Sequence, residues 1–299
     1  MNRRQYSVPG IALVVAVFVL LAAAPAGTQQ EQQRSSPLDA IPWEDGPTVG
    51  QLGDIAEIKV PQGFRFTGAA GAKQFLEMTE NPTSGSELGI LIPPNRDNES
   101  FWFMVFEFND VGYVKDDEKN KLDGDTILTS IQEGTAAANE ERKRRGWTPF
   151  YVLGWAKPPY YDQSTNNLTW AIRGSGSETG GGEETINYSV RVLGRRGTMN
   201  IDLVLSAGQL ERVRPYFDLL LKDFSFSKGN KYAEFRAGDK IAAYGLTALV
   251  AGGAGAALVK SGLLQKFWKV IALAFIALAT QLKRIFNWIR GRRSEEQEA

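Results

Sequence analysis

The chain has 299 residues, 43% of them hydrophobic and 23% charged, a composition typical of a globular protein of one or two domains. Its 34 Lys and Arg residues balance its 34 Asp and Glu residues, so net charge gives no support for nucleic-acid binding. Cysteine and histidine are absent, which excludes disulfides, thiolate nucleophiles and a lipobox and removes the usual zinc ligands and hydrolase-triad base.

Residues 1–26 have the pattern of a secretory signal peptide. Arg3 and Arg4 precede the apolar stretch Ile11–Ala24, and small residues lead to a cleavage point before Gly27. An uncleaved anchor is the alternative, although the apolar stretch is shorter than the about 20 residues of a typical span. Both interpretations place the following residues outside the cytoplasm. Residues 27–42, rich in Gln, Glu, Ser and Pro, are predicted to be a flexible linker.

Residues 43–237 are expected to fold as one extracytoplasmic α+β domain. Apolar periodicity, Gly and Pro turn signals and helix-end charges predict the elements. Helices are expected at Ala69–Met78, Asp123–Arg145 and Leu210–Leu221, the last despite Pro215. Strands are expected at Ala56–Val60, Leu88–Ile92, Phe101–Phe108, Phe150–Trp155, Leu168–Arg173, Thr185–Leu193, Thr198–Leu205 and Phe224–Ser227.

Short connections between these strands, including the tight turn Gly194–Gly197 and the glycine-rich loop Gly174–Gly182, indicate an antiparallel sheet flanked by helices. The order of elements resembles the Mog1/PsbP-like arrangement, in which a meander is flanked by helices.

The C-terminal part contains two apolar stretches. Ile241–Val259 is uncharged and long enough to span a bilayer, so a transmembrane helix is predicted at residues 240–260. Ala248, Gly252 and Ala256 repeat every four residues and would form a small-residue face for helix packing or self-association in lipid. A buried glycine-rich helix of a soluble protein is the alternative.

Residues 261–299 form a basic, partly apolar tail with a second apolar stretch, Val270–Ala279. A single crossing would leave every cation of this tail in the cytoplasm, next to anionic lipid, as the positive-inside rule favours. A hairpin of two crossings would place Lys283 and the terminal arginines outside. Both topologies remain open, and the single crossing is favoured. The implied location is the bacterial cytoplasmic membrane, with the main domain outside.

Catalytic and cofactor motifs fail on their spacing. A calcium loop from Asp116 would place Lys121 where glycine is needed and Ile127 where glutamate is needed. Ser225-Phe226-Ser227-Lys228 matches the letters S-x-x-K without its companion motifs, and Val259 replaces the glycine that a phosphate loop needs before its lysine. We therefore expect no cofactor and no metal.

One aromatic and acidic cluster is a candidate ligand-binding face. Aromatic rings beside polar groups can bind sugars or peptides. A loop held on the sheet edge by its rings would explain the same residues. The candidate face, placed around a turn, comprises Trp155, Tyr160, Tyr161, Asp162 and Trp170.

Several short motifs resemble a known family. They are Gly46-Pro47 with Leu52-Gly53, Val60–Phe64, Gly112-Tyr113-Val114, Asn139 with Arg142 and Gly146-Trp147, Gly154-Trp155 with Tyr161-Asp162, Leu193-Gly194-Arg195 with Gly197, and Asp239-Lys240 with Tyr244–Leu246. Together they resemble the bacterial membrane-anchored family called domain of unknown function 2167, over residues 43–259. The resemblance implies a membrane-anchored protein and carries no activity and no catalytic residues.

The leading hypothesis is a membrane-anchored, non-enzymatic envelope module that binds a protein or an envelope polymer. One alternative is a carboxylate-dependent enzyme that acts on envelope glycan. A second is an accessory subunit of a transport or secretion system with a C-terminal hairpin.

Overall fold

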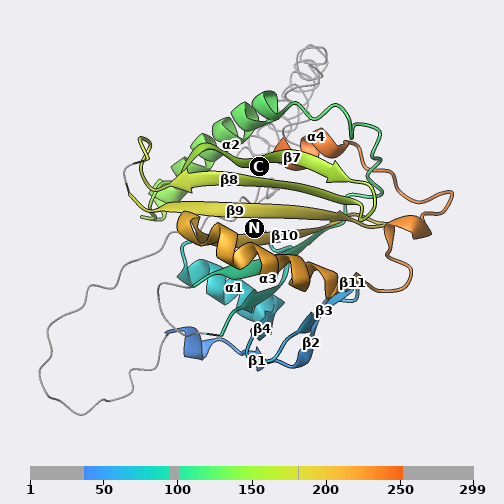
Figure 1. Cartoon of the computed structure of the whole chain (residues 1–299), viewed down its shortest axis with the longest axis horizontal. Helices are drawn as coiled ribbons and strands as arrows, with labels where there is room; N and C mark the ends of the chain where they lie inside the picture. The colour runs from blue at the N-terminus through green and yellow to red at the C-terminus, as the bar shows by residue number, and fades with distance from the viewer. Residues whose placement is uncertain (1–36, 95–100, 181, 252–299) are drawn as a thin grey trace, which may run out of the picture. The chain divides into compact units, whose positions relative to one another are not determined.

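The strands form two antiparallel sheets (Figure 1). The structure, a computed structural model, describes residues 37–94, 101–180 and 182–251, all within the compact unit Met1–Gly253. A second unit, Ala254–Ala299, lies outside these residues. In spatial order the large sheet contains β1 (Glu44–Asp45), β4 (Arg65–Gly68), β5 (Glu87–Ile92), β6 (Phe103–Asn109), β10 (Thr198–Ser206), β9 (Glu184–Leu193), β8 (Asn167–Ser175) and β7 (Tyr151–Asp162). The small sheet contains β11 (Phe224–Phe226), β3 (Ala56–Val60) and β2 (Thr48–Leu52).

Both faces of the large sheet are covered, as β6 shows. Its side chains alternate between two hydrophobic clusters because successive strand residues point to opposite faces. Phe103 and Val105 pack with α1 (Ala69–Met78). Met104 and Phe106 pack with α3 (Leu210–Lys222) and the small sheet. This double burial explains why the strand sequence is apolar without alternation.

Local sequence signals set the ends of α2 (Gly124–Arg144). The Asp123 carboxylate accepts a hydrogen bond from the Thr126 amide at 3.1 Å, which caps the first turn. Basic residues occupy the last turn, and Gly146 follows with φ of +71°. The helix lies along β7, and the Asn139 side chain bonds both the amide and the carbonyl of Phe150 at 2.9 and 2.7 Å.

The β9–β10 hairpin has the predicted tight connection. The Gly194 amide donates to the Gly197 carbonyl at 2.8 Å. A Cβ at Gly197 would lie 1.9 Å from the Asn109 carbonyl oxygen, so only glycine lets β6 approach this turn.

The predicted α+β class with a large antiparallel sheet is confirmed. Sequence reasoning missed β1, β2 and β4. It also treated the residues after Trp155 as a turn, whereas β7 continues to Asp162 through Pro158 and Pro159. Proline is tolerated there because β7 is an edge strand with irregular register.

The folded domain extends beyond residues 43–237 at both ends. Pro37–Ala40 form the 3-10 helix η1 and Ile41 is buried in the α1 cluster, so the last residues of the predicted flexible linker are ordered. At the other end, α4 (Leu246–Ala251) packs against α2. Across residues 37–94, 101–180 and 182–251, no helix has the length and apolar character that a membrane crossing needs. The predicted signal peptide, residues 252–260 of the predicted span and the tail at 261–299 lie outside the described residues.

Candidate functional site

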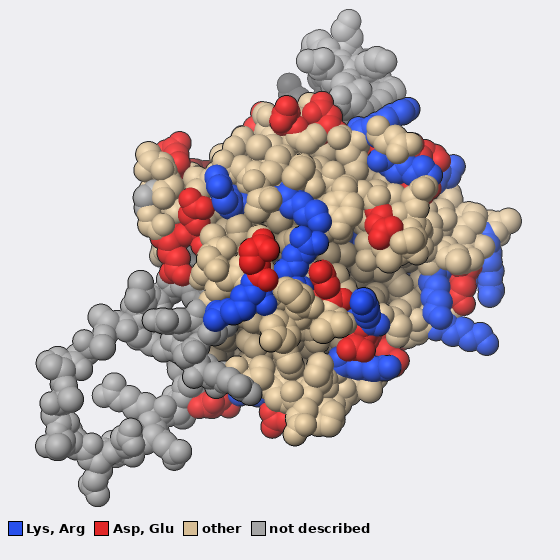
Figure 2. Space-filling model, viewed as in Figure 1, with Lys and Arg blue, Asp and Glu red and all other residues tan. Residues whose placement is uncertain are grey.

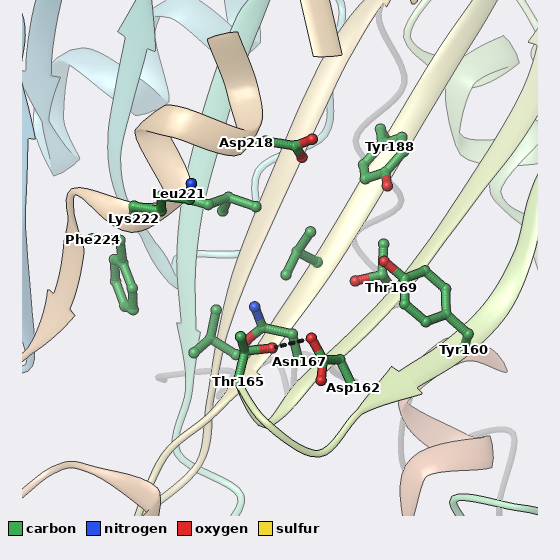
Figure 3. A pocket seen from close by; sticks show the side chains of 12 residues that line it. Tyr160, Asp162, Thr165, Asn167, Thr169, Tyr188, Asp218, Leu221, Lys222 and Phe224 are labelled. Carbon is green, nitrogen blue, oxygen red and sulfur yellow. Dashed lines mark hydrogen bonds between the residues drawn. The ribbon is translucent and has the colours of Figure 1, made fainter. Parts of the chain in front are cut away.

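A groove of about 410 Å³ lies between α3 and the β7–β9 end of the large sheet (Figure 3). It combines aromatic rings, an apolar wall and several polar groups. The lining residues are Tyr160, Asp162, Thr165, Asn167, Thr169, Tyr188, Val190, Val192, Asp218, Leu221, Lys222 and Phe224. Polar groups around an apolar wall can orient a bound ligand, which makes the groove a candidate site.

The turn between β7 and β8 fixes one end of the groove. The Asp162 carboxylate accepts hydrogen bonds from the Ser164 amide at 2.9 Å and from the hydroxyls of Ser164 and Thr165 at 2.7 and 3.1 Å. These bonds stabilise the ionised form, so they lower the pKa of Asp162. Asp162 is therefore a fixed negative charge whose acceptor capacity is largely used within its own turn.

Tyr188 on β9 lies at the base of the groove. Its side chain is 3% exposed, and its ring packs edge-on against Phe217 of α3 with centroids 5.4 Å apart. Burial raises the pKa of Tyr188 to about 12, so the hydroxyl stays protonated at neutral pH. Lys157 Nζ donates to this hydroxyl at 3.3 Å and lies 4.0 Å from the centroid of the Tyr160 ring.

Helix α3 supplies the opposite wall. Its core residues Val213, Phe217 and Leu220 follow helical spacing and face the sheet. Asp218 and Lys222 flank this stripe, and Figure 3 shows Asp218 of α3 and Tyr188 of β9 on opposite sides of the groove. The Asp218 carboxylate also lies 3.6 Å from the Arg214 guanidinium, one helical turn earlier.

The structure brings only two of the five residues of the predicted face into the groove, Tyr160 and Asp162. The Trp155 indole donates to the Gly124 carbonyl at 3.2 Å, which fixes it against the start of α2. The Tyr161 hydroxyl donates to Asn166 Oδ1 at 3.3 Å. Trp170 is 2% exposed, with the Arg191 guanidinium 4.7 Å from its ring centroid. Alternation along β7 and β8 separates these residues.

Sequence reasoning did not find Tyr188, Asp218 or Lys222. The exposed polar positions of the amphipathic α3 were a usable signal for the last two. Tyr188 had none, since an isolated tyrosine in a strand is usually part of the core. Of the predicted helix-packing face, Ala248 is buried in α4, while Gly252 and Ala256 lie outside the described residues.

A row of buried polar side chains crosses the opposite face of the sheet. Arg191 on β9 bonds Asp202 on β10 at 3.0 Å, and the Ser189 hydroxyl also donates to Asp202. Glu107 on β6 is 1% exposed. Burial, reinforced by the negative charge of Asp202, raises the pKa of Glu107 to about 8. Glu107 therefore keeps its proton at neutral pH.

In the part of the chain that the structure describes, no group of three or more Asp and Glu side chains is arranged to hold a metal ion. The Glu87 carboxylate, next to Glu107 in the sheet, is used locally: it accepts hydrogen bonds from the Ser84 and Gly85 amides at 2.5 and 2.8 Å. The groove is therefore the candidate site.

The strand order and covering helices define an α+β protein built on one large antiparallel sheet, with a polar and aromatic groove at one end. The chain belongs to the family described as protein of unknown function (DUF2167), whose model matches residues 44–283. The family resemblance of the short motifs is thereby confirmed. No curated protein matches the sequence.

Solved structures similar to this chain share little sequence with it. Cyanobacterial PsbP (CyanoP) from Synechocystis sp. PCC 6803 is 10% identical, with 62% of this chain and 91% of that chain covered and a TM-score of 0.35. A point mutant of the protein Mog1 is 12% identical, with 60% and 95% covered and a TM-score of 0.31. The Saccharomyces cerevisiae Ran-binding protein Mog1p is 10% identical, with 60% and 93% covered and a TM-score of 0.30.

Proposed function

We propose that this protein is a membrane-anchored, extracytoplasmic binding module whose groove holds a segment of an envelope partner, either a protein or a polymer. The observation that carries the proposal is the groove itself. It places the exposed Tyr160 ring, the Asp218 carboxylate and the Lys222 ammonium around an apolar wall. Such a surface can bury an apolar group and orient it with hydrogen bonds.

The carboxylates of the groove favour binding over hydrolysis. Glycosidases pair an ionised carboxylate with a protonated one whose pKa is raised. Asp162 is held ionised by its turn, so it is unsuited to the role of the acid. Asp218 forms an ion pair of 3.6 Å with Arg214, one helical turn earlier on α3. The alternative of a glycan-cleaving enzyme predicts that Asp162→Asn abolishes turnover of isolated cell-wall glycan, whereas a binding module shows no turnover in either form.

Site-specific photo-crosslinking in intact cells tests groove binding. A benzophenone amino acid is introduced at Tyr160, which is 40% exposed in the groove, or at Tyr216, which is 57% exposed on α3 and outside the lining. The binding proposal predicts a discrete adduct from position 160 and none of the same mass from position 216. Equal adducts from both positions, or none from position 160, would contradict it.

Anchoring is proposed from the sequence. We propose the crossing at the predicted residues 240–260, an uncharged stretch with the length of a span, of which the described part Leu246–Ala251 is the helix α4 beside α2. The cysteine-free chain permits a clean test with single cysteines at Gln163 in the exposed β7–β8 turn and at Ser294 in the basic tail. An impermeant thiol reagent added to cells should label position 163 and not position 294.

Labelling of both positions would favour the C-terminal hairpin and with it the transport or secretion accessory. Labelling of neither in intact cells, but of both after lysis, would place the domain in the cytoplasm and refute the proposal.

A further inference from the structure

The chain between β11 and α4 folds onto the β9–β10 turn and forms a defined surface. We call residues 194–197 and 227–241 the basic platform. The Arg195 amide donates to the Asn230 carbonyl at 2.8 Å, and Gly194 forms a β-bridge with Lys231. The backbone of the platform is therefore held in place by hydrogen bonds to the β9–β10 turn.

The two acids of the platform are engaged in hydrogen bonds within it. Asp239 accepts two hydrogen bonds of 2.7 Å from the Arg195 guanidinium and one from the Arg236 amide at 2.7 Å. Glu234 accepts from the amides of Gly229 and Lys231 at 2.7 and 2.9 Å. Both carboxylates thus stabilise the conformation of residues 227–241.

Aromatic stacking supports the platform from below. The rings of Tyr113 and Tyr232 stack with centroids 4.4 Å apart and planes 10° apart, and Phe235 lies 4.3 Å from Tyr113. The Tyr232 hydroxyl donates to the Val114 carbonyl at 2.9 Å. This support leaves Phe235 partly outside, with 40% of its surface exposed.

The outward side of the platform is cationic and apolar. The platform contains six cationic and two acidic side chains, a net charge of +4 in a chain whose total charge is zero. Phe235 and Ile241 are 40% and 41% exposed among these cations. Lys and Arg gather at the right-hand edge of Figure 2, where Figure 1 shows the turns that follow β11. The exposed cations are Arg196, Lys228, Lys231, Arg236 and Lys240.

We propose that the basic platform rests on an anionic lipid surface, with Phe235 and Ile241 in the headgroup region. The inference rests on the proposed membrane anchoring and adds an orientation of the domain to it. Cations beside exposed apolar side chains are the combination that binds such surfaces. Ile241 is also the first residue of the uncharged stretch Ile241–Val259 in which the crossing is proposed, so an anchored chain keeps the platform close to the bilayer.

The test uses the full-length chain in vesicles. A single cysteine replaces the exposed Ala237 on the platform or, as a control, Gln163 in the β7–β8 turn, and carries an environment-sensitive fluorophore. Vesicles contain phosphatidylcholine alone or mixed with phosphatidylglycerol, and a lipid-attached quencher reports contact with the bilayer. We expect quenching at position 237 only with phosphatidylglycerol, and none at position 163.

Charge variants establish the cause. Lys231→Gln with Arg236→Gln should weaken the lipid contact of position 237 on the order of 25-fold, since each cation near an anionic surface strengthens binding by about fivefold. The matched pair Lys143→Gln with Arg144→Gln, exposed cations at the end of α2, should leave it unchanged. Equal effects of both pairs would overturn the proposal.

Other outcomes separate the platform from the anchor. Flotation of the vesicles measures membrane binding of the whole chain. If the chain floats with both vesicle types, but the fluorophore at position 237 is not quenched or is quenched equally in both, the platform proposal is overturned and the anchor proposal stands. Chain that floats only with phosphatidylglycerol, in a manner that needs Lys231 and Arg236, supports the platform and contradicts the anchor. Chain that floats with neither contradicts both. Shielding of position 237 by polyglutamate, but not by anionic vesicles, overturns the lipid assignment in favour of an acidic protein.

Discussion

Replacing Glu107 by glutamine should stabilise the protein at neutral pH. In the folded protein the pKa of Glu107 is about 8, against an ordinary value of 4.5, because the carboxyl is buried beside Asp202. The folded state therefore holds a proton that the unfolded state releases. The stability from this proton is complete below about pH 4.5 and is lost as pH rises toward 8.

The size of the effect follows from the pKa difference. Each unit corresponds to about 1.4 kcal/mol, so between pH 4.5 and neutral pH the wild type loses about 3 kcal/mol of unfolding free energy through this group. Glutamine has nearly the shape of the protonated acid and does not titrate. The variant and the wild type should therefore have similar stability near pH 4.5 and diverge as pH rises, with the variant more stable.

Urea unfolding followed by tryptophan fluorescence, at several values between about pH 5 and pH 8, measures this difference. Taking the difference between variant and wild type cancels the other titrating groups. Glu133→Gln, on the exposed side of α2, is the matched control for replacing a glutamate by glutamine outside the core. A flat difference for Glu107→Gln, or one that favours the wild type as pH rises, would refute the assigned protonation.

Three further changes test the packing and the platform. Asn139→Ala leaves the amide and carbonyl of Phe150 buried without their partner and should cost about 2–5 kcal/mol of unfolding free energy in urea; a loss below about 0.5 kcal/mol would contradict a buried double hydrogen bond. Phe217→Ala opens a cavity between α3 and the sheet and should lower the free energy of unfolding by about 3–5 kcal/mol. A loss as small as that of a surface substitution would contradict the packing of α3 on the sheet. Arg195 lowers the pKa of Asp239 to about 2, so their pairing contributes stability above the ordinary value of 3.8 that is lost as pH falls toward 2. The protection of platform amides, taken relative to the intrinsic exchange rate at each pH, should therefore fall over that window in the wild type and fall less in Arg195→Gln, where Asp239 keeps only its bond from the Arg236 amide.

Elements whose signals are local could be predicted from the sequence. The ends of α2 follow from Asp123 and Gly146, and the β9–β10 hairpin follows from Gly194 and Gly197. The strand β6 was visible as a continuous apolar stretch because both of its faces are covered. The helix ends and the hairpin are determined by neighbours in the chain, and the apolar stretch of β6 can be recognised without knowing which elements cover it.

The candidate site depends on tertiary pairing, and only two of its lining residues were predicted. Tyr160 and Asp162 stood out because they lie in one aromatic stretch, but Tyr188 and Asp218 join them through the packing of β9 and α3. Because successive residues of a strand point to opposite faces of the sheet, Tyr161 points away from the groove. A pattern along the chain cannot distinguish the two sides of an irregular edge strand whose register shifts, as β7 does.

Binding to isolated envelope fractions tests the central claim most directly. Full-length wild type, Tyr160→Ala with Lys222→Ala in the groove, and Tyr216→Ala with Lys143→Ala outside it are compared for saturable, competable co-sedimentation. If the groove is the binding site, the groove variant loses at least about tenfold in affinity, equivalent to about 1.4 kcal/mol, while the outside variant matches wild type. Equal affinity of all three proteins, with the groove variant folded, would contradict a binding function of the groove.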